Sequence, residues 1–149
     1  MNVTLAENII KEKLLNDSQI EIPVELFPNN PTDYPLLNDL GDILILYTGS
    51  DFPQNLIAEG LGVLLQENLN VNIRLRMRDL RGNSGTVDYI ERIKNSLLGL
   101  DITQYNENRH SRLLITAIRY VDYNESLGIW EYDIIVQFPT DQKMNELNY

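Results

Sequence analysis

Residues 71–78, VNIRLRMR, alternate strictly between apolar and polar side chains. The apolar positions are Val71, Ile73, Leu75 and Met77, and three of the four polar positions are arginine. A period of two places successive side chains on opposite faces of a strand. The segment therefore predicts a strand with one face on a core and one basic face, which requires a sheet that is covered on one side only.

The pattern changes to helical spacing after this strand. Apolar residues then recur every third or fourth position, which predicts a helix with Ser84 as its N-cap and Gly99 at its end. A second helix is expected over residues 4–15, where Thr4 and Glu7 form a capping-box pattern. Two helices are thus available to cover one face of the sheet.

Further strands are expected in five places: a short edge strand at residues 20–26, a buried central strand at 42–48, an apolar run at 61–66, and a long hairpin of 112–123 with 129–138. In the last strand, Trp130, Tyr132, Ile134, Val136 and Phe138 share the face predicted to be core. Because the strands are grouped rather than alternated with helices, we predict an α+β fold. It has one mostly antiparallel mixed sheet of about four to five strands with two helices packed on it.

A chain of 149 residues fits one domain. We predict a single α+β domain over residues 1–138 that contains a Pro-rich loop at 27–41. The polar segment 139–149 is too short of apolar residues to fold alone, so it is expected to form a C-terminal arm.

Composition excludes several kinds of site. The chain has no cysteine and one histidine, His110, which leaves no disulfide, no thiolate ligand and no pair of histidines. We predict no catalytic, metal-binding or cofactor-binding residues. The net charge of -10 opposes binding to nucleic acid, and the longest uninterrupted apolar run, 43–47, is far short of a membrane span of roughly 20 residues. A protein partner is therefore expected.

A row of arginines falls within eight residues of this acidic chain, at Arg74, Arg76, Arg78 and Arg81. One interpretation is a solvated face or a set of cross-strand pairs with Glu131 and Asp133, worth only about 0.2 to 1 kcal/mol each. The other is a subunit contact, since guanidinium groups suit interfaces. We choose these six residues as the predicted subunit interface.

The loop Gly82–Gly85 precedes the second helix and offers an alternative function. Helix N-termini favour anions, so the loop suits a small enzyme or an anion-binding domain. It lacks the ending of a Walker loop and the third glycine of a dinucleotide fingerprint, and a strand-to-helix turn favours glycine in any case. This function is the second choice.

Three segments, GDILILYTGSDF, residues 61–100 and residues 111–138, resemble in their order a family of small proteins from Mu-like, contractile-tailed phages. The family is encoded among the tail-assembly genes. The resemblance covers about residues 40–138. Its most recognisable points are the strand-Leu-Arg-Gly-x-x-Gly-helix junction at residues 80–85 and the aromatic strand at residues 130–132.

The resemblance implies a tail terminator or tail-completion (minor tail) protein, located in the tail or neck of the virion and made in the host cytoplasm. Such a protein assembles with itself as a ring, typically a hexamer, caps the tail tube and sheath, and joins the tail to the neck or head–tail connector protein. Its role is not catalytic, and DNA passes through the lumen without specific binding. Another neck or baseplate component remains an alternative.

Overall fold

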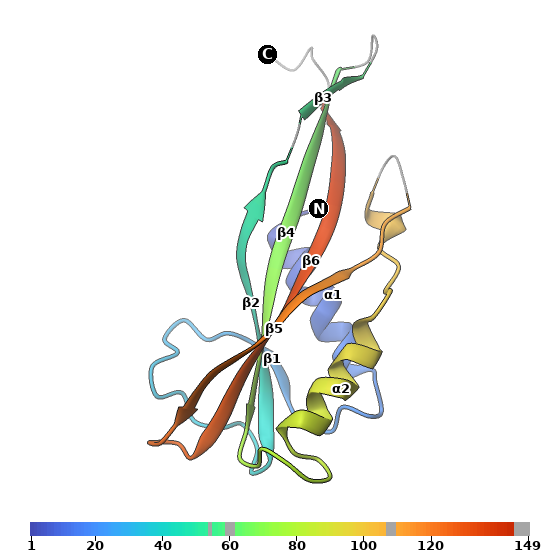
Figure 1. Cartoon of the computed structure of the whole chain (residues 1–149). Coiled ribbons are helices and arrows are strands. Elements are labelled where there is room, and N and C mark those ends of the chain that lie inside the picture. Colours follow the sequence, from blue (N-terminus) through green and yellow to red (C-terminus); the bar gives the residue numbers. More distant parts are fainter. Residues whose placement is uncertain (54, 59–61, 107–109, 145–149) are drawn as a thin grey trace.

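The computed structural model describes residues 1–53, 55–58, 62–106 and 110–144. Within these ranges the chain forms two α-helices, one short 3-10 helix, η1 (Thr103–Tyr105), and one six-stranded sheet (Figure 1). The helices are α1 (Val3–Leu15) and α2 (Thr86–Leu97). The predicted α+β fold is confirmed.

The strands are β1 (Val24–Leu26), β2 (Gly41–Asp51), β3 (Asn55–Ala58), β4 (Gly62–Met77), β5 (Leu114–Asn124) and β6 (Ile129–Met144). Their order is β1-β2-β4-β6-β5, and β3 pairs with the start of β4. Only the β1–β2 pair is parallel among these strands, so the sheet is mixed and mostly antiparallel. The central strand is β4 rather than β2, because β4 pairs with β2, β3 and β6.

β4 and β6 are longer than the sequence patterns predict. The two neighbouring strands expected before α2 are parts of one strand, β4, which has 16 residues, and β6 also has 16. The two strands pair from Met77↔Trp130 to Val63↔Met144 and continue together past the helices towards β3 (Figure 1). Residues 139–144 therefore lie in the sheet and not in a terminal arm. Residues 145–149 lie outside the described residues.

α1 begins one residue before its predicted start and has a different cap. The Asn2 side chain accepts a hydrogen bond from the Leu5 amide at 2.7 Å. The predicted capping box of Thr4 and Glu7 is wrong, because the Glu7 carboxylate instead accepts a hydrogen bond from the backbone amide of Tyr47 in β2 at 2.9 Å. An acidic side chain of the first helix thus binds the sheet.

α2 is capped by Gly85, and not by Ser84 as predicted. Ser84 has a φ of 68°, and a Cβ at Gly85 would lie 2.4 Å from the Arg81 carbonyl oxygen. The turn is therefore too tight for any residue but glycine at position 85. Gly99, with a φ of 70°, ends the helix region as predicted.

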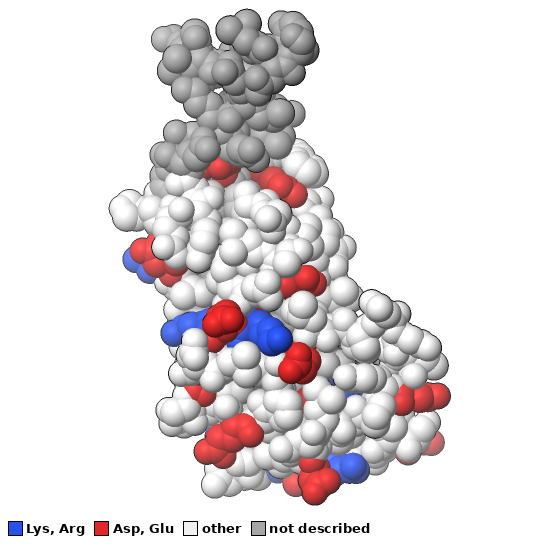
Figure 2. All heavy atoms as spheres, turned by 180° about the vertical axis from the view of Figure 1, so that it is seen from behind, with Lys and Arg blue, Asp and Glu red and all other residues white. Residues whose placement is uncertain are grey.

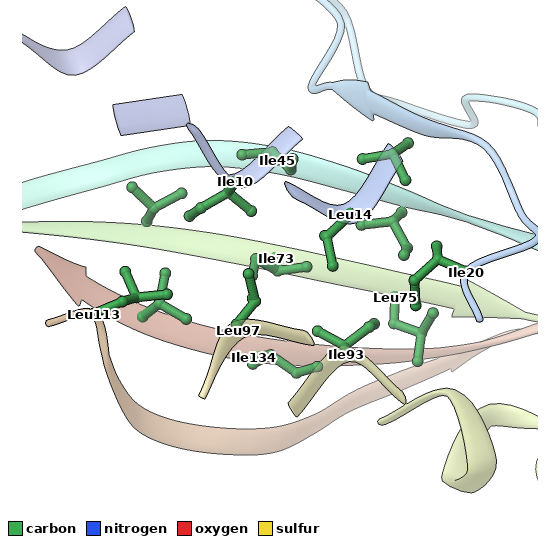
Figure 3. Packing of buried hydrophobic residues seen from close by; sticks show 14 of the residues in the cluster. Ile10, Leu14, Ile20, Ile45, Ile73, Leu75, Ile93, Leu97, Leu113 and Ile134 are labelled. Atoms are coloured by element: carbon green, nitrogen blue, oxygen red, sulfur yellow. The ribbon is translucent and has the colours of Figure 1, made fainter. Parts of the chain in front are cut away.

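The core lies between the sheet and the two helices, which cover the same sheet face (Figure 3). All the apolar positions of the alternating segment are buried there, together with apolar residues of α1, α2, β2 and β6. The labelled members are Ile10, Leu14, Ile20, Ile45, Ile73, Leu75, Ile93, Leu97, Leu113 and Ile134. The opposite face, here called the open face, has no helix of the described chain on it and carries Arg74 and Arg76.

Candidate interaction surfaces

Arg76 is buried on the open face and is held entirely by its own chain. Its Nε and Nη2 donate to Asp42 Oδ1 and Oδ2 at 2.8 and 2.6 Å, and Asp42 is itself 0% exposed. Arg76 also donates to the carbonyl oxygens of Tyr34 and Pro35, while Asp42 accepts from the Leu37 amide. Arg76 and Asp42 therefore fasten the loop of residues 27–40 to the sheet.

This network changes the expectation for Arg76. Its side chain is 4% exposed, so within the subunit it has almost no surface to offer a neighbouring copy. Its registered neighbour on β6 is Glu131, but its ion pair is with Asp42 on β2. A buried pair of this kind contributes most through the cost of leaving one member alone. Arg76 is a structural residue of the subunit.

The predicted cross-strand pairing is confirmed for Arg74. It lies opposite Asp133 in the β4–β6 ladder and donates to both carboxylate oxygens, at 2.6 and 2.9 Å. The hydrogen bonds to Asp133 raise the pKa of Arg74, against the effect of burial. Arg78 is exposed and donates to the backbone carbonyls of Asp39 and Leu127. Both arginines therefore have partners within the subunit.

Glu131 and Arg81 have no side-chain hydrogen bond to a described residue, unlike the other four residues of the predicted interface. Neither has an ion pair with any described residue. Loss of solvent raises the pKa of the Glu131 carboxyl group, and the nearby Arg74 and Arg76 oppose this shift without pairing with it. Arg81 is exposed in the turn before α2. Within the described ranges three of the six residues, Arg78, Arg81 and Glu131, have no ion pair, and the interface assignment stays a prediction.

A pocket of about 280 Å³ opens on the open face beside Glu131. The loop 27–40 and the β5–β6 hairpin contribute to its walls. It is lined by Phe27, Pro31, Thr32, Leu44, Arg74, Arg76, Asn124 and Glu131. Because Asp133 and Asp42 neutralise the two arginines, the charge left over in the pocket is the carboxylate of Glu131.

β5 is an edge strand that pairs only with β6 among the described strands. Five of its large apolar side chains are exposed: Leu114, Ile118, Tyr120, Val121 and Tyr123. A long edge with apolar side chains is a template for pairing with another chain. Sequence reasoning predicted this strand but did not single out its surface, because periodicity does not distinguish an exposed edge from a covered one.

The β5–β6 hairpin also carries a group of aromatic side chains. The ring centroids of Tyr120 and Tyr132 lie 5.5 Å apart, and those of Tyr123 and Trp130 lie 4.8 Å apart. Trp130 and Tyr132 were predicted to be core residues, but both are only partly buried and contact exposed tyrosines of β5. Tyrosine and tryptophan of this kind are enriched at protein interfaces.

Charged side chains on one side of the molecule are shown in Figure 2. Several basic side chains form a short band across the middle, with acidic side chains directly beside it, and other basic side chains lie apart from the band. The band is not an extended basic surface of the kind that follows a nucleic-acid backbone.

Four successive amides at the end of the loop Gly82–Gly85 and the start of α2 are already hydrogen-bonded within the chain. The amides of Thr86 and Val87 donate to the carbonyls of Asp79 and Leu80, at 2.8 and 3.1 Å. The Ser84 amide donates to the carboxylate of Asp88 at 3.0 Å. The amides at the start of α2 are thus bound by the chain itself, which removes the support for the anion-binding alternative.

In the part of the chain that the structure describes, no cluster of three or more His, Cys, Asp or Glu side chains is arranged to hold a metal ion. None of the described helices is long and apolar enough to cross a membrane. A family model with the description Gp37 protein matches residues 13–144. No curated protein matches the sequence.

Proposed function

We propose that this chain, which belongs to the Gp37 protein family and is therefore a phage-related protein, is a structural component of the phage tail. In the finer form of the proposal it is a tail terminator. Copies of the chain form a ring, a hexamer in the family that the sequence resembles, at the head-proximal end of the tail. The role needs no catalytic residue.

The ring acts by covering the growing end of the tail. Once it is bound, further tube and sheath subunits have no surface to add to, and the opposite side of the ring receives the neck or head–tail connector protein. DNA passes through the lumen. The net charge of -10 suits this passage, since an acidic wall does not hold phosphate groups.

The observation that carries the proposal is the exposed apolar edge of β5. A protein that worked as a lone subunit would gain nothing from exposing Leu114, Ile118 and Tyr120 on a strand with one free edge. A subunit that is completed by its neighbours needs such a surface. The chain's membership of a phage protein family agrees with this use.

Electron microscopy of particles made without the protein tests the proposal. We expect assembled heads beside tails of irregular length or tails that fail to join the heads. Normal virions in the absence of the protein contradict it. The mass of the purified protein by light scattering is a second test, in which a ring is expected at high protein concentration.

A further inference from the structure

The pocket beside Glu131 has the chemistry of a site for a basic side chain. Its walls include the apolar side chains of Phe27, Pro31 and Leu44, which suit the methylene stem of an arginine or lysine. Its uncompensated charge is the Glu131 carboxylate, which has no ion pair with a described residue. The Glu131 carboxylate is already partly desolvated. A guanidinium or ammonium group that binds in the pocket can form a charge-assisted hydrogen bond with it.

Arg119 lies in the middle of β5 and is a cation without a partner among the described residues. It is exposed, and none of those residues pairs with it or accepts a hydrogen bond from it. Its neighbour across the β5–β6 ladder is Asp133, but both oxygens of that carboxylate are taken by Arg74. The exposed Ile118 and Tyr120 flank it. Its guanidinium group is thus available to a partner at an apolar sheet edge.

We propose that β5 of one copy packs against the open face of the next copy, so that Arg119 enters the pocket and pairs with the neighbour's Glu131. The inference rests on the proposed function, because it requires copies of the chain to associate. Each copy gives one Arg119 and receives one, and a repeated head-to-tail contact of this kind forms a ring when the rotation between copies closes.

Local complementarity favours a second copy as the occupant, because the same chain carries both the acidic pocket and the exposed Arg119 on an apolar edge. The net charge of -10 opposes association of copies, so a contact between them needs apolar burial together with pairing of opposite charges. The β5 edge supplies both, and the pocket supplies the complementary anion and apolar walls. The planar guanidinium group of arginine also suits bidentate pairing with a carboxylate.

Complementary charge reversals test this contact. Arg119→Glu and Glu131→Arg are made separately, with Lys13→Glu as a control that changes the same charge at an exposed position on α1. Circular dichroism verifies that each variant is folded, and Glu131→Gln serves as the second variant if Glu131→Arg is not. Sedimentation or light scattering up to about 1 mM protein then measures association.

We expect each reversal to weaken association by at least about 30-fold, and the control to leave it unchanged. An equal mixture of the two reversed proteins restores assembly, because the carboxylate introduced at position 119 of one copy then meets the guanidinium group introduced at position 131 of the next. The remaining contacts between the copies are those of the wild type.

Three results contradict the proposed contact. The first is a single reversed variant that associates as strongly as the wild type, and the second is a mixture of the two reversed variants that stays dissociated. The third is a wild-type protein that remains monomeric at every protein concentration tested. The electron microscopy of particles made without the protein does not depend on these results. The contact between Arg119 and Glu131 can therefore fail while the proposed role in the tail stands.

Discussion

The two edges of the sheet are built in opposite ways. At one edge, β1 has only three residues and lies between Pro23 and Pro28. Other groups protect this side of the sheet beyond β1. The amide of Tyr47 in β2 donates to the carboxylate of Glu7, and the loop 27–40 is fastened to the sheet by Asp42 of β2 and Arg76 of β4. A strand from another chain would have to displace these groups before it could pair with β2.

The other edge is not covered by a loop or helix of the described chain, although it carries two register shifts and the charges of Arg119 and Asp122. β5 runs for 11 residues without a proline, and no side chain of another described element binds its outward backbone groups. Tyr120 is 55% exposed, and Leu114, Ile118, Val121 and Tyr123 are exposed beside it. Natural sheets shorten, charge or cover their edges. The contrast between the two edges supports the proposal that a partner covers β5.

The largest effect is expected at the covered edge. Arg76→Ala leaves the Asp42 carboxylate buried without its ion-pair partner, which is expected to cost about 3 to 5 kcal/mol of folding free energy. Arg78→Ala is the control, two residues further along the chain and just past the end of β4. It is exposed, and its loss is expected to cost less than about 1 kcal/mol. Urea unfolding measures both, and equal effects would remove Arg76 from its structural role.

At the β5 edge, association should change more than folding. Tyr120→Lys replaces one ring of the exposed aromatic group with a charged side chain. It is expected to weaken the free energy of association by about 2 kcal/mol or more, as is typical when a hot-spot residue is lost. The monomer loses only the ring contacts with Tyr132 and Trp130, worth about 0.5 to 1.5 kcal/mol each. Sedimentation and thermal unfolding of the same sample separate the two. A large loss of stability with unchanged association would contradict the edge comparison.

Removing the side chain that covers the β1–β2 side of the sheet is expected to have a smaller effect on stability and to increase aggregation. Glu7→Ala leaves the Tyr47 amide without its acceptor, which is expected to cost about 1 kcal/mol. It also exposes a donor on β2 to other chains, so non-specific aggregation should rise. Glu12→Ala, at an exposed position of the same helix, provides the control. Turbidity during mild heating is the measurement, and identical curves for the two variants would show that Glu7 does not protect the edge.

The smallest effect concerns Glu131 and depends on pH. Its pKa is raised by loss of solvent, so ionisation of the folded state is disfavoured. As pH rises above the ordinary value for glutamate, the unfolded chain ionises first and the folded state loses stability, fully so above the folded pKa. Glu131→Gln should therefore stabilise the monomer at pH 7, by less than about 1 kcal/mol after solvent screening, and leave it unchanged near pH 3.5. Thermal unfolding at both pH values is the measurement, and a gain that is absent or equal at the two values would refute this account of Glu131.

The features that the sequence predicted correctly are those that local periodicity determines, such as the face of a strand on which each side chain lies. The alternation of β4 assigned Ile73 and Leu75 to the core and Arg74 to the face where it meets Asp133, because a period of two fixes the faces of a strand. The partner of Arg76 could not be found this way, since Asp42 lies on a different strand and the loop that covers both has no periodic pattern.

The C-terminal extent of β6 and the unpaired charges of two strand residues could not be predicted from the sequence for a related reason. β6 continues through Pro139, Thr140 and Asp141 because β4 is long enough to pair with it, which the polar sequence of the segment does not indicate. Arg119 and Glu131 each appear as one charge in an alternating strand. That both lack a partner among the described residues follows only from the ladder and from the hydrogen bonds that occupy Asp133.

A crosslinking experiment tests the contact between Arg119 and Glu131 of neighbouring copies most directly. The chain contains no cysteine, so Arg119→Cys and Glu131→Cys each introduce a single thiol. The two variants are mixed under assembling conditions and treated with a short thiol-specific crosslinker. We predict that covalent pairs form in the mixture and join position 119 of one copy to position 131 of another, as identified by mass spectrometry. Crosslinks that join only like positions, or none above the level of unassembled protein, would contradict the proposed contact.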